Sequence, residues 1–307
     1  MIPGKREMTP VAGLFIVFLT VLFGANVVAI KLSLAGMGPL TTPGLRFALA
    51  ALAIACWARA TGRRFRIHPG QGIQLAIVSA AFTVQLSLFY LGLARTYASR
   101  GVLISNLLPF FVLFLSHRFI PGERITWNKM VGIMLGFCGV AVLFSDSLGA
   151  SGAFKTGDPI VLTAVAVWSG NVVDTKRNIH AYEPFHLVLY PMVVSVPVFL
   201  AAGLLWDSRM IIDMNPVVVG AFAYQGLVTA AFGFVAWSTM LQRYGASTLH
   251  VFVFIMPVAG VVLSGTLLHE PITSNLIVAL VFIAAGILMV HASPRRPSFT
   301  FPLGRGL

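Results

Sequence analysis

Charged side chains are scarce in this sequence. Asp, Glu, Lys and Arg make up only 10% of the 307 residues, whereas 58% are hydrophobic, and the mean hydropathy is +0.90. Soluble globular domains carry about 25% charged residues and about 45–50% apolar ones. The composition therefore excludes an ordinary soluble domain and indicates a chain that lies mostly within a membrane.

Cysteines are few, and catalytic motifs are missing. Cys56 and Cys138 fall in different apolar segments with no further ligand candidates nearby, so we expect two packing residues, no disulfide framework and no metal site. His269-Glu270 begins like a zinc-protease motif, but Thr273 stands where the second histidine would be. No Gly-x-Ser-x-Gly elbow lies at a plausible depth, and there is no Walker loop. We therefore predict no enzyme, no cofactor and no direct use of ATP.

Long apolar segments dominate the chain. A helix needs about 20 apolar residues to cross a hydrocarbon core about 30 Å thick. Ten segments meet this length, with loosely defined ends: 11–34, 43–60, 71–92, 99–116, 127–145, 159–175, 185–206, 216–241, 247–268 and 274–291. In the fifth, Gly132 and Gly136 have the spacing of small residues at a close helix contact.

The two halves of the chain repeat one another. The segment 23–31, Phe-Gly-Ala-Asn-Val-Val-Ala-Ile-Lys, returns at 168–176 as Trp-Ser-Gly-Asn-Val-Val-Asp-Thr-Lys. Further matching pairs are Arg95 and Arg243, Ala98 and Ala246, Ser99 and Ser247, Pro109 and Pro257, and Glu123 and Glu270. Five spans per repeat is an odd number, so the second copy must enter the membrane from the opposite side.

The predicted fold is therefore an all-α integral membrane protein with ten transmembrane helices, arranged as two inverted five-helix repeats. Residues 8–146 form the first repeat, 147–154 a linker, 155–292 the second repeat, and 293–307 a basic cytoplasmic tail. Inverted repeats can enclose a cavity near the middle of the bilayer that opens to either side in turn.

The basic residues predict the orientation. If the N-terminus is cytoplasmic, 15 of the 21 Lys and Arg residues fall on the inner side and six on the outer side. Short cytoplasmic loops retain positive charge, so we expect a multi-pass inner (plasma) membrane protein with both termini in the cytoplasm. The net charge of +12 then indicates contact with anionic lipid headgroups rather than with nucleic acid.

Four motifs together resemble the EamA family of the drug/metabolite transporter superfamily. They are Gly24-x-Asn26 with Lys31, Pro43-Gly44-Leu45-Arg46-Phe47, the run from Ala98-Ser99-Arg100 to Asn106-Leu107-Leu108-Pro109-Phe110, and Pro121-Gly122-Glu123-Arg124. The resemblance covers about residues 10 to 292 and implies ten helices in two inverted repeats and export of small metabolites, with YddG-type amino-acid exporters as one branch. The sequence departs from the family pattern at Phe23 and at Trp168-Ser169-Gly170, where many members have tryptophan-glycine.

Polar and aromatic residues within the spans are the candidates for binding a solute, because such residues are costly in lipid and are usually functional. The repeat places Asn26 and Asn171 across the pseudo-axis, facing each other, or else bridging helices within each repeat. Trp168 is predicted to form a cavity wall rather than an interfacial belt. The predicted substrate-binding residues are Asn26, Tyr90, Asn106, Trp168, Asn171, Tyr224, Gln225 and Trp237.

A second group could gate the pathway or couple it to protons. Arg46 and Arg100 could guide an anionic or zwitterionic solute or meet lipid phosphates. Asp174 could carry a proton or form a local ion pair, and His250 could titrate near neutrality. Pro109 and Pro257 predict kinks in the fourth and ninth spans that serve packing or a hinge. The group comprises Arg46, Arg100, Pro109, Asp174, His250 and Pro257.

These residues favour a secondary transporter that exports small organic metabolites by alternating access. Aromatic faces, amides and few fixed charges suit an amino acid, aromatic or from a broad range, better than a sugar phosphate. The alternatives are a drug or other metabolite exporter of the same family and a passive channel. The direction of export follows from the resemblance alone, and the residues leave proton coupling and the oligomeric state open.

Overall fold

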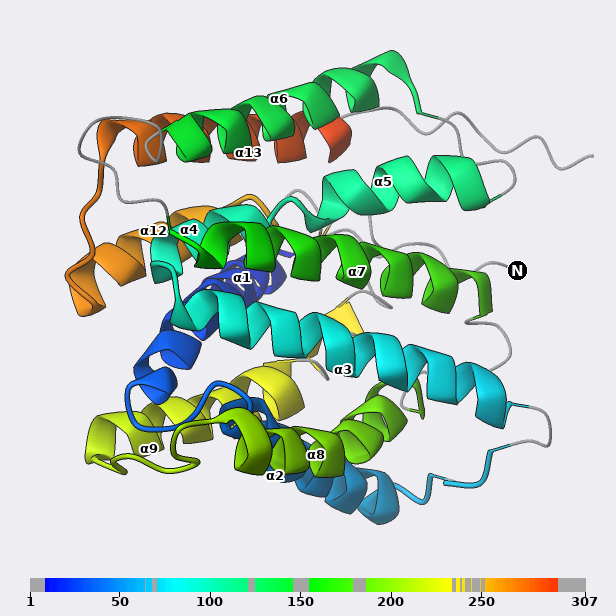
Figure 1. The fold of residues 1–307 in the computed structure, drawn as a ribbon. Helices are drawn as coiled ribbons and strands as arrows, with labels where there is room; N and C mark the ends of the chain where they lie inside the picture. Colours follow the sequence, from blue (N-terminus) through cyan, green and yellow to red (C-terminus); the bar gives the residue numbers. More distant parts are fainter. Residues whose placement is uncertain are drawn as a thin grey trace, which may run out of the picture.

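The chain folds into a helical bundle (Figure 1). The computed structural model describes residues 9–63, 65–67, 71–120, 125–145, 155–178, 186–233, 236–237, 239–240, 244, 249 and 252–291. The helices of these parts are α1 (Pro10–Leu34), α2 (Thr41–Ala60), α3 (Gly72–Ala94), α4 (Ala98–Ser105), α5 (Leu108–Phe119), α6 (Trp127–Ser145), α7 (Gly157–Asn178), α8 (His186–Trp206), α9 (Pro216–Ala223), the π-helix η2 (Tyr224–Gly233), α12 (Ile255–Leu267) and α13 (Ser274–His291). No strand occurs in the described residues apart from an isolated bridge between Met37 and Ile211.

The lengths and surfaces of these helices fit a membrane. Six of them are long and apolar enough to cross it: α1, α2, α3, α8, the pair α4–α5 and the pair α9–η2. Large apolar side chains cover the outside of the bundle, among them Leu14 and Ile73, 72% and 76% exposed. Such a surface is favourable against lipid tails and costly in water. The prediction of an all-α membrane protein is therefore confirmed.

The two halves of the chain interlock rather than lie apart. α2 packs against α8, α6 against α13, α1 against α12, and α3 against α7. Each of these pairs joins a helix before the 147–154 segment to one after it, and the pair of α6 and α13 forms one edge of the bundle in Figure 1. Pairing of corresponding helices, α2 with α8 and α6 with α13, is the arrangement expected from repeats related by a two-fold axis.

Glycines bring α6 and α13 together. A Cβ atom added to Gly286 would lie 2.6 Å from the carbonyl oxygen of Gly132, and one added to Gly132 would lie 2.7 Å from that of Gly286. The predicted close helix contact at Gly132 is confirmed. In contrast, Cys56 and Cys138 are exposed on the outer faces of their helices, so the prediction that they are packing residues is wrong.

The prolines coincide with breaks in two predicted spans. The fourth span is two helices, because the α-helix ends at Ser105 and restarts at Leu108, with Pro109 in the first turn of α5. α12 begins at Ile255, so Pro257 also lies in a first turn, where a proline costs no helical hydrogen bond. Both predicted kinks therefore take the form of a break, with the proline in the first turn of the helix that follows it.

A glycine-to-alanine substitution in α13 tests whether α6 and α13 are in tight contact. We expect Gly286→Ala to lower the free energy of unfolding by about 1–3 kcal/mol, because the neighbouring atom is a backbone oxygen that cannot move aside. Gly170→Ala is the matched control, since nothing lies within 4 Å of its added Cβ. Thermal unfolding in detergent checks this, and equal midpoints for the two variants would contradict the packing.

Candidate functional site

The predicted eighth span is not a regular α-helix. α9 continues without interruption into the ten-residue π-helix η2, where the Thr229 hydroxyl donates to the carbonyl of Tyr224, five residues back. π-helices are rare and often lie at functional sites. Two predicted binding residues, Tyr224 and Gln225, occupy its first two positions, and the Tyr224 hydroxyl donates to the carbonyl of Leu22 in α1 at 2.6 Å.

A buried hydrogen-bond network joins Gln225 to three other helices. Arg46 Nη1 of α2 donates to the hydroxyl of Tyr90 in α3 at 2.9 Å, and this hydroxyl donates to Gln225 Oε1 at 3.2 Å. Gln225 Nε2 donates to Ser33 Oγ and to the carbonyl of Ala29 in α1, at 2.5 and 3.0 Å. We call Arg46, Tyr90, Gln225 and Ser33 the Arg46 cluster.

The Arg46 cluster unites three predicted site residues from distant parts of the sequence. Tyr90 and Gln225 are fully buried and Arg46 is 7% exposed, so lipid phosphates are not in contact with its guanidinium, and that alternative is wrong. The guanidinium also lies 5.1 Å from the centre of the Phe47 ring, within reach of a cation–π interaction. Ser33 was missed, because a serine near a helix end carries no distinctive signal.

The two repeat-related asparagines lie in different helix pairs. Asn171 Nδ2 donates to Gln85 Oε1 of α3 at 3.3 Å, because α7 packs along α3, whereas α1, which carries Asn26, packs along α12. In the described part of the chain no hydrogen bond joins the two amides, and their facing a shared solute across the pseudo-axis stays a prediction. Their Oδ1 atoms are both buried without a hydrogen-bond donor. Each of these two oxygens can therefore accept a further hydrogen bond.

The other predicted binding residues have separate surroundings. Asn106 Nδ2 donates to the carbonyl of Val102 in its own chain segment, at the break between α4 and α5. Trp237 packs edge-on against Phe23, with ring centres 5.8 Å apart. Trp168 is half-buried in α7, one turn from Asn171.

Arg100 forms a buried ion pair that the sequence did not predict. Its Nε donates to Asp158 Oδ2 at 2.7 Å and its Nη2 to the carbonyl of Leu143 at 3.0 Å, while Thr96 donates to the other oxygen of Asp158. Arg100 and Asp158 are 8% and 1% exposed. Arg100 therefore neither lines an outer vestibule nor contacts lipid phosphates, the two roles that the sequence had suggested. Asp158 was overlooked because it stands just before the predicted span.

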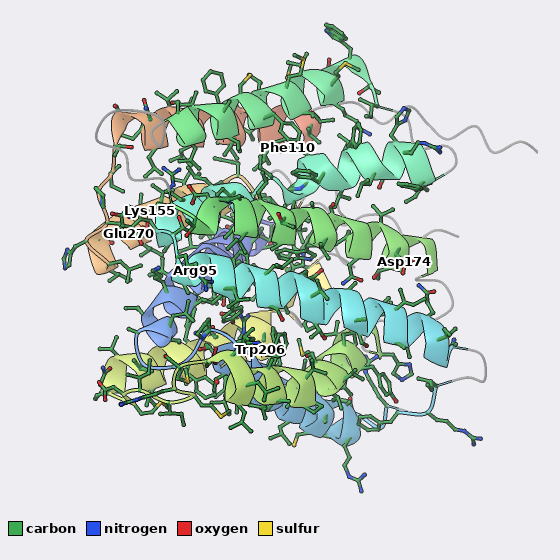
Figure 2. All side chains as sticks on the ribbon, viewed as in Figure 1. Arg95, Phe110, Lys155, Asp174, Trp206 and Glu270 are labelled. Carbon is green, nitrogen blue, oxygen red and sulfur yellow. The ribbon has the colours of Figure 1, made fainter. Side chains whose placement is uncertain are left out.

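Asp174 lies at the opposite end of α7, where it accepts a hydrogen bond from Gln74 of α3. Figure 2 shows it far from Arg95, Lys155 and Glu270, which gather at the other end of the bundle. His250 lies outside the described residues. Among the residues that the structure covers, no group of His, Cys, Asp or Glu side chains could hold a metal ion.

Two carboxylates cap helix N-termini at the end of the bundle that contains Glu270. Glu270 accepts from the backbone N–H groups of Ala98 and Ser99 at 2.6 and 2.8 Å, so it caps the N-terminus of α4. Asp207 accepts from the N–H groups of Leu40 and Thr41 at 3.2 and 2.8 Å and caps α2 in the same way. A carboxylate at a helix N-terminus satisfies unpaired N–H groups and the helix dipole.

Further contacts complete this end. Lys31 Nζ donates to the carbonyls of Leu93 and Thr96 at 2.7 and 2.5 Å, and the bridge between Met37 and Ile211 joins two connections. We call this end, with Glu270, Asp207, Lys31 and the bridge, the tied end. Sequence reasoning missed it, although the repeat had marked Glu270 as the counterpart of Glu123.

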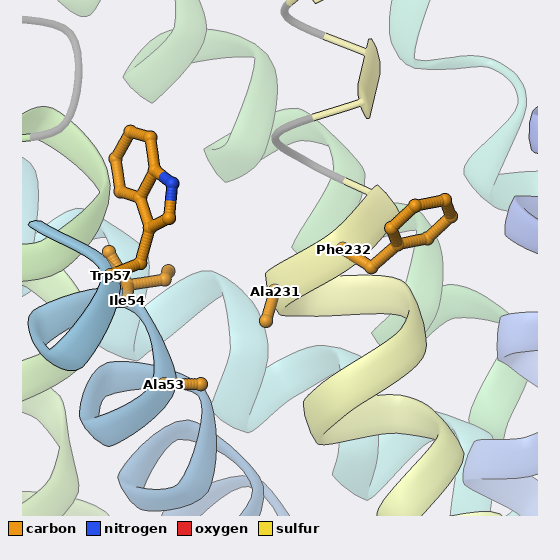
Figure 3. A pocket seen from close by; sticks show the side chains of 5 residues that line it. All are labelled: Ala53, Ile54, Trp57, Ala231 and Phe232. Carbon is orange, nitrogen blue, oxygen red and sulfur yellow. The ribbon is translucent and has the colours of Figure 1, made fainter. Parts of the chain in front are cut away.

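An apolar hollow of about 260 Å³ lies between α2 and η2 (Figure 3). It is lined by Ala53, Ile54, Trp57, Ala231 and Phe232. None of the predicted site residues lines it. The hollow therefore offers apolar contact and no polar group that could orient a solute.

Apolar helices around enclosed polar networks define a multi-pass membrane protein of the transporter class. The chain belongs to the EamA-like transporter family, whose model matches residues 11–145 and again 155–292. The family and the names of its relatives indicate a membrane transporter and not an enzyme.

Several relatives span nearly the whole chain. One from Escherichia coli (strain K12), named "Probable amino-acid metabolite efflux pump", is 28% identical over 90% of this chain and 93% of its own. A protein of the same name from Salmonella typhimurium is 27% identical over the same shares. An "Uncharacterized transporter" from Archaeoglobus fulgidus is 29% identical over 89% of this chain and 96% of its own.

A solved structure has the same fold. It superposes with a TM-score of 0.67 at 17% sequence identity and covers 92% of this chain and 96% of its own. This likeness shows that the chain has the fold of that solved structure.

The ion pair of Arg100 and Asp158 should stabilise the fold rather than bind solute. Asp158→Asn leaves a buried arginine without its charge partner, so we expect a loss of about 3–5 kcal/mol in unfolding free energy. The double variant Arg100→Met/Asp158→Leu should recover most of this loss, because it removes both charges. Thermal unfolding and transport of all three proteins check this. A stable double variant without transport would contradict a purely structural role.

Proposed function

We propose that this protein is a secondary transporter that exports small organic metabolites, with amino acids as the first candidates, by alternating access. The observation that carries the proposal is the Arg46 cluster, in which polar side chains of α1, α2, α3 and η2 meet inside an otherwise apolar bundle. Interior polar groups in a membrane protein are costly and mark solute pathways.

The names of the relatives support a class of transported solute but do not identify the solute. Two relatives at 27–28% identity are named as probable amino-acid metabolite efflux pumps, whereas one at 29% is an uncharacterized transporter. Identity of this size supports a metabolite exporter. Amino acids remain the more specific proposal, and another metabolite or a drug remains the alternative within the family.

The proposed setting is the inner (plasma) membrane, with both termini in the cytoplasm and the basic loops on anionic headgroups. In that orientation the tied end faces outward. A protein closed at its tied end then admits solute from the cytoplasm, as an exporter requires, and releases it after the contacts of Glu270 and Asp207 open.

Asn171 and Trp168 are proposed as solute contacts on α7. The buried Oδ1 of Asn171 has no donor, so it can accept a hydrogen bond from an ammonium group. Trp168, one turn away, offers an apolar face beside it.

Counterflow in proteoliposomes tests this function. Vesicles loaded with unlabelled amino acids should accumulate labelled amino acids transiently, with and without a proton gradient. Asn171→Ala and Trp168→Ala should lower the initial rate about tenfold, equivalent to about 1.4 kcal/mol. Gly170→Ala, on the same helix with open space around its Cβ, should leave the rate unchanged.

Two outcomes contradict the proposal. Absence of counterflow for every amino acid would exclude this cargo, and movement down a gradient without counterflow would indicate a channel. A rate that responds to the proton gradient would add proton coupling.

A further inference from the structure

Arg46 is a buried cation without a carboxylate partner among the described residues. Every carboxylate there has a partner elsewhere: Asp158 with Arg100, Asp174 with Gln74, Asp207 with Leu40 and Thr41, Asp213 with Asn215, and Glu270 with Ala98 and Ser99. The sequence contains four more acidic residues, Glu7, Glu123, Asp146 and Glu183, which all lie outside the predicted spans. Within the described part of the chain, the guanidinium thus carries a positive charge that no carboxylate compensates.

Such a charge is costly to retain. An arginine within a membrane-spanning helix is unfavourable on membrane-insertion scales. Arg46 also lies in the second turn of α2, close to the positively polarised N-terminus of that helix, which disfavours a cation. The contacts with Tyr90 and Phe47 are to neutral groups and offset only part of this cost. A purely structural role for Arg46 does not explain why this position carries a positive charge.

The free edge of the guanidinium has the geometry of an anion site. Nη1 donates to Tyr90, whereas Nε is buried without an acceptor and Nη2 has none among the described residues. Nε–H and Nη2–H point the same way from the planar group and form the fork that binds a carboxylate through two parallel hydrogen bonds. Tyr90 therefore occupies the one nitrogen that this fork does not need.

The rest of the Arg46 cluster holds the fork in place. Gln225 Nε2 lies within hydrogen-bond distance of the carbonyls of Ala29 and Ala221 and of Ser33 Oγ, and its two N–H groups are used among these acceptors. Oε1 is therefore turned toward the Tyr90 hydroxyl. That hydroxyl must donate to Gln225, so its oxygen accepts from Arg46. The guanidinium is therefore oriented before any anion arrives.

We propose that the Nε–Nη2 edge of Arg46 binds the carboxylate of the transported solute, and that Tyr90, Gln225 and Ser33 are its positioning residues. This inference rests on the proposed function and narrows it, because the cargo must carry a carboxylate. A lipid phosphate is not the anion, since Arg46 is enclosed by protein.

Competition in the counterflow assay tests the inference. The probe is a mixture of labelled proteinogenic amino acids, and the competitors are L-phenylalanine, N-acetyl-L-phenylalanine and L-phenylalanine amide, of which only the amide lacks a carboxylate. For the wild-type protein, both carboxylates should compete at least about tenfold more strongly than the amide, as expected for loss of about 1.4 kcal/mol.

Variants of Arg46 should change this selectivity. Arg46→Gln should abolish the preference for carboxylates, and Arg46→Lys should keep the preference at a lower rate, because lysine keeps the charge and loses the fork. Arg95→Gln is the matched control: Arg95 is exposed, donates a hydrogen bond to the carbonyl of Leu91, and should behave as wild type. If Arg46→Gln does not yield monodisperse protein, the competition profile of Arg46→Lys decides.

The outcomes are distinct. Two results would overturn the anion site and leave the proposed function standing. In the first, the amide inhibits wild-type counterflow as strongly as the two acids do. In the second, all three competitors lose the same share of their inhibition in both Arg46 variants. Dependence of wild-type counterflow on chloride, with no carboxylate preference, would assign the edge to an inorganic anion and overturn the inference as well. Absence of wild-type counterflow would overturn both proposals.

Discussion

A polar group inside a bilayer must find its partner within the protein, and the fold of this chain follows from that constraint. The helices expose apolar side chains outward, and the polar side chains gather where the first half of the chain meets the second. Gln225 of η2 reaches α1 and α3, Asp158 of α7 reaches α4, and Glu270 reaches the start of α4. The interface between the halves therefore holds both the polar contacts and the proposed solute site.

The polar contacts across this interface have two physical roles. At the tied end, carboxylates bind helix N-termini, and these charge-assisted bonds are strong yet can be exchanged for water when the end opens. In the Arg46 cluster, the hydrogen bonds instead orient a cation that has no carboxylate partner among the residues that the structure describes. In the proposed mechanism, the first set holds the tied end closed, and the second provides an anchor that a solute reaches after opening.

The sequence predicted the features that depend on local pattern. Apolar length identified the spans, the repeat identified two copies of one five-span unit, and the glycine spacing identified a close helix contact at Gly132. It could not predict which distant polar residues meet: Arg46, Tyr90 and Gln225 were each candidates, but their contact depends on the packing of three helices. The π-helix leaves no periodic signal, and Asp207 lies in a connection that looks like an ordinary loop.

The proposed alternating access requires that the tied end opens during transport. Cysteines at Met37 and Ile211, which face each other in the bridge, should form a disulfide across it in a protein whose Cys56 and Cys138 are replaced by alanine. Counterflow should stop on oxidation and return on reduction. Undiminished counterflow by the fully cross-linked protein would show that this end stays closed throughout transport and would contradict the account.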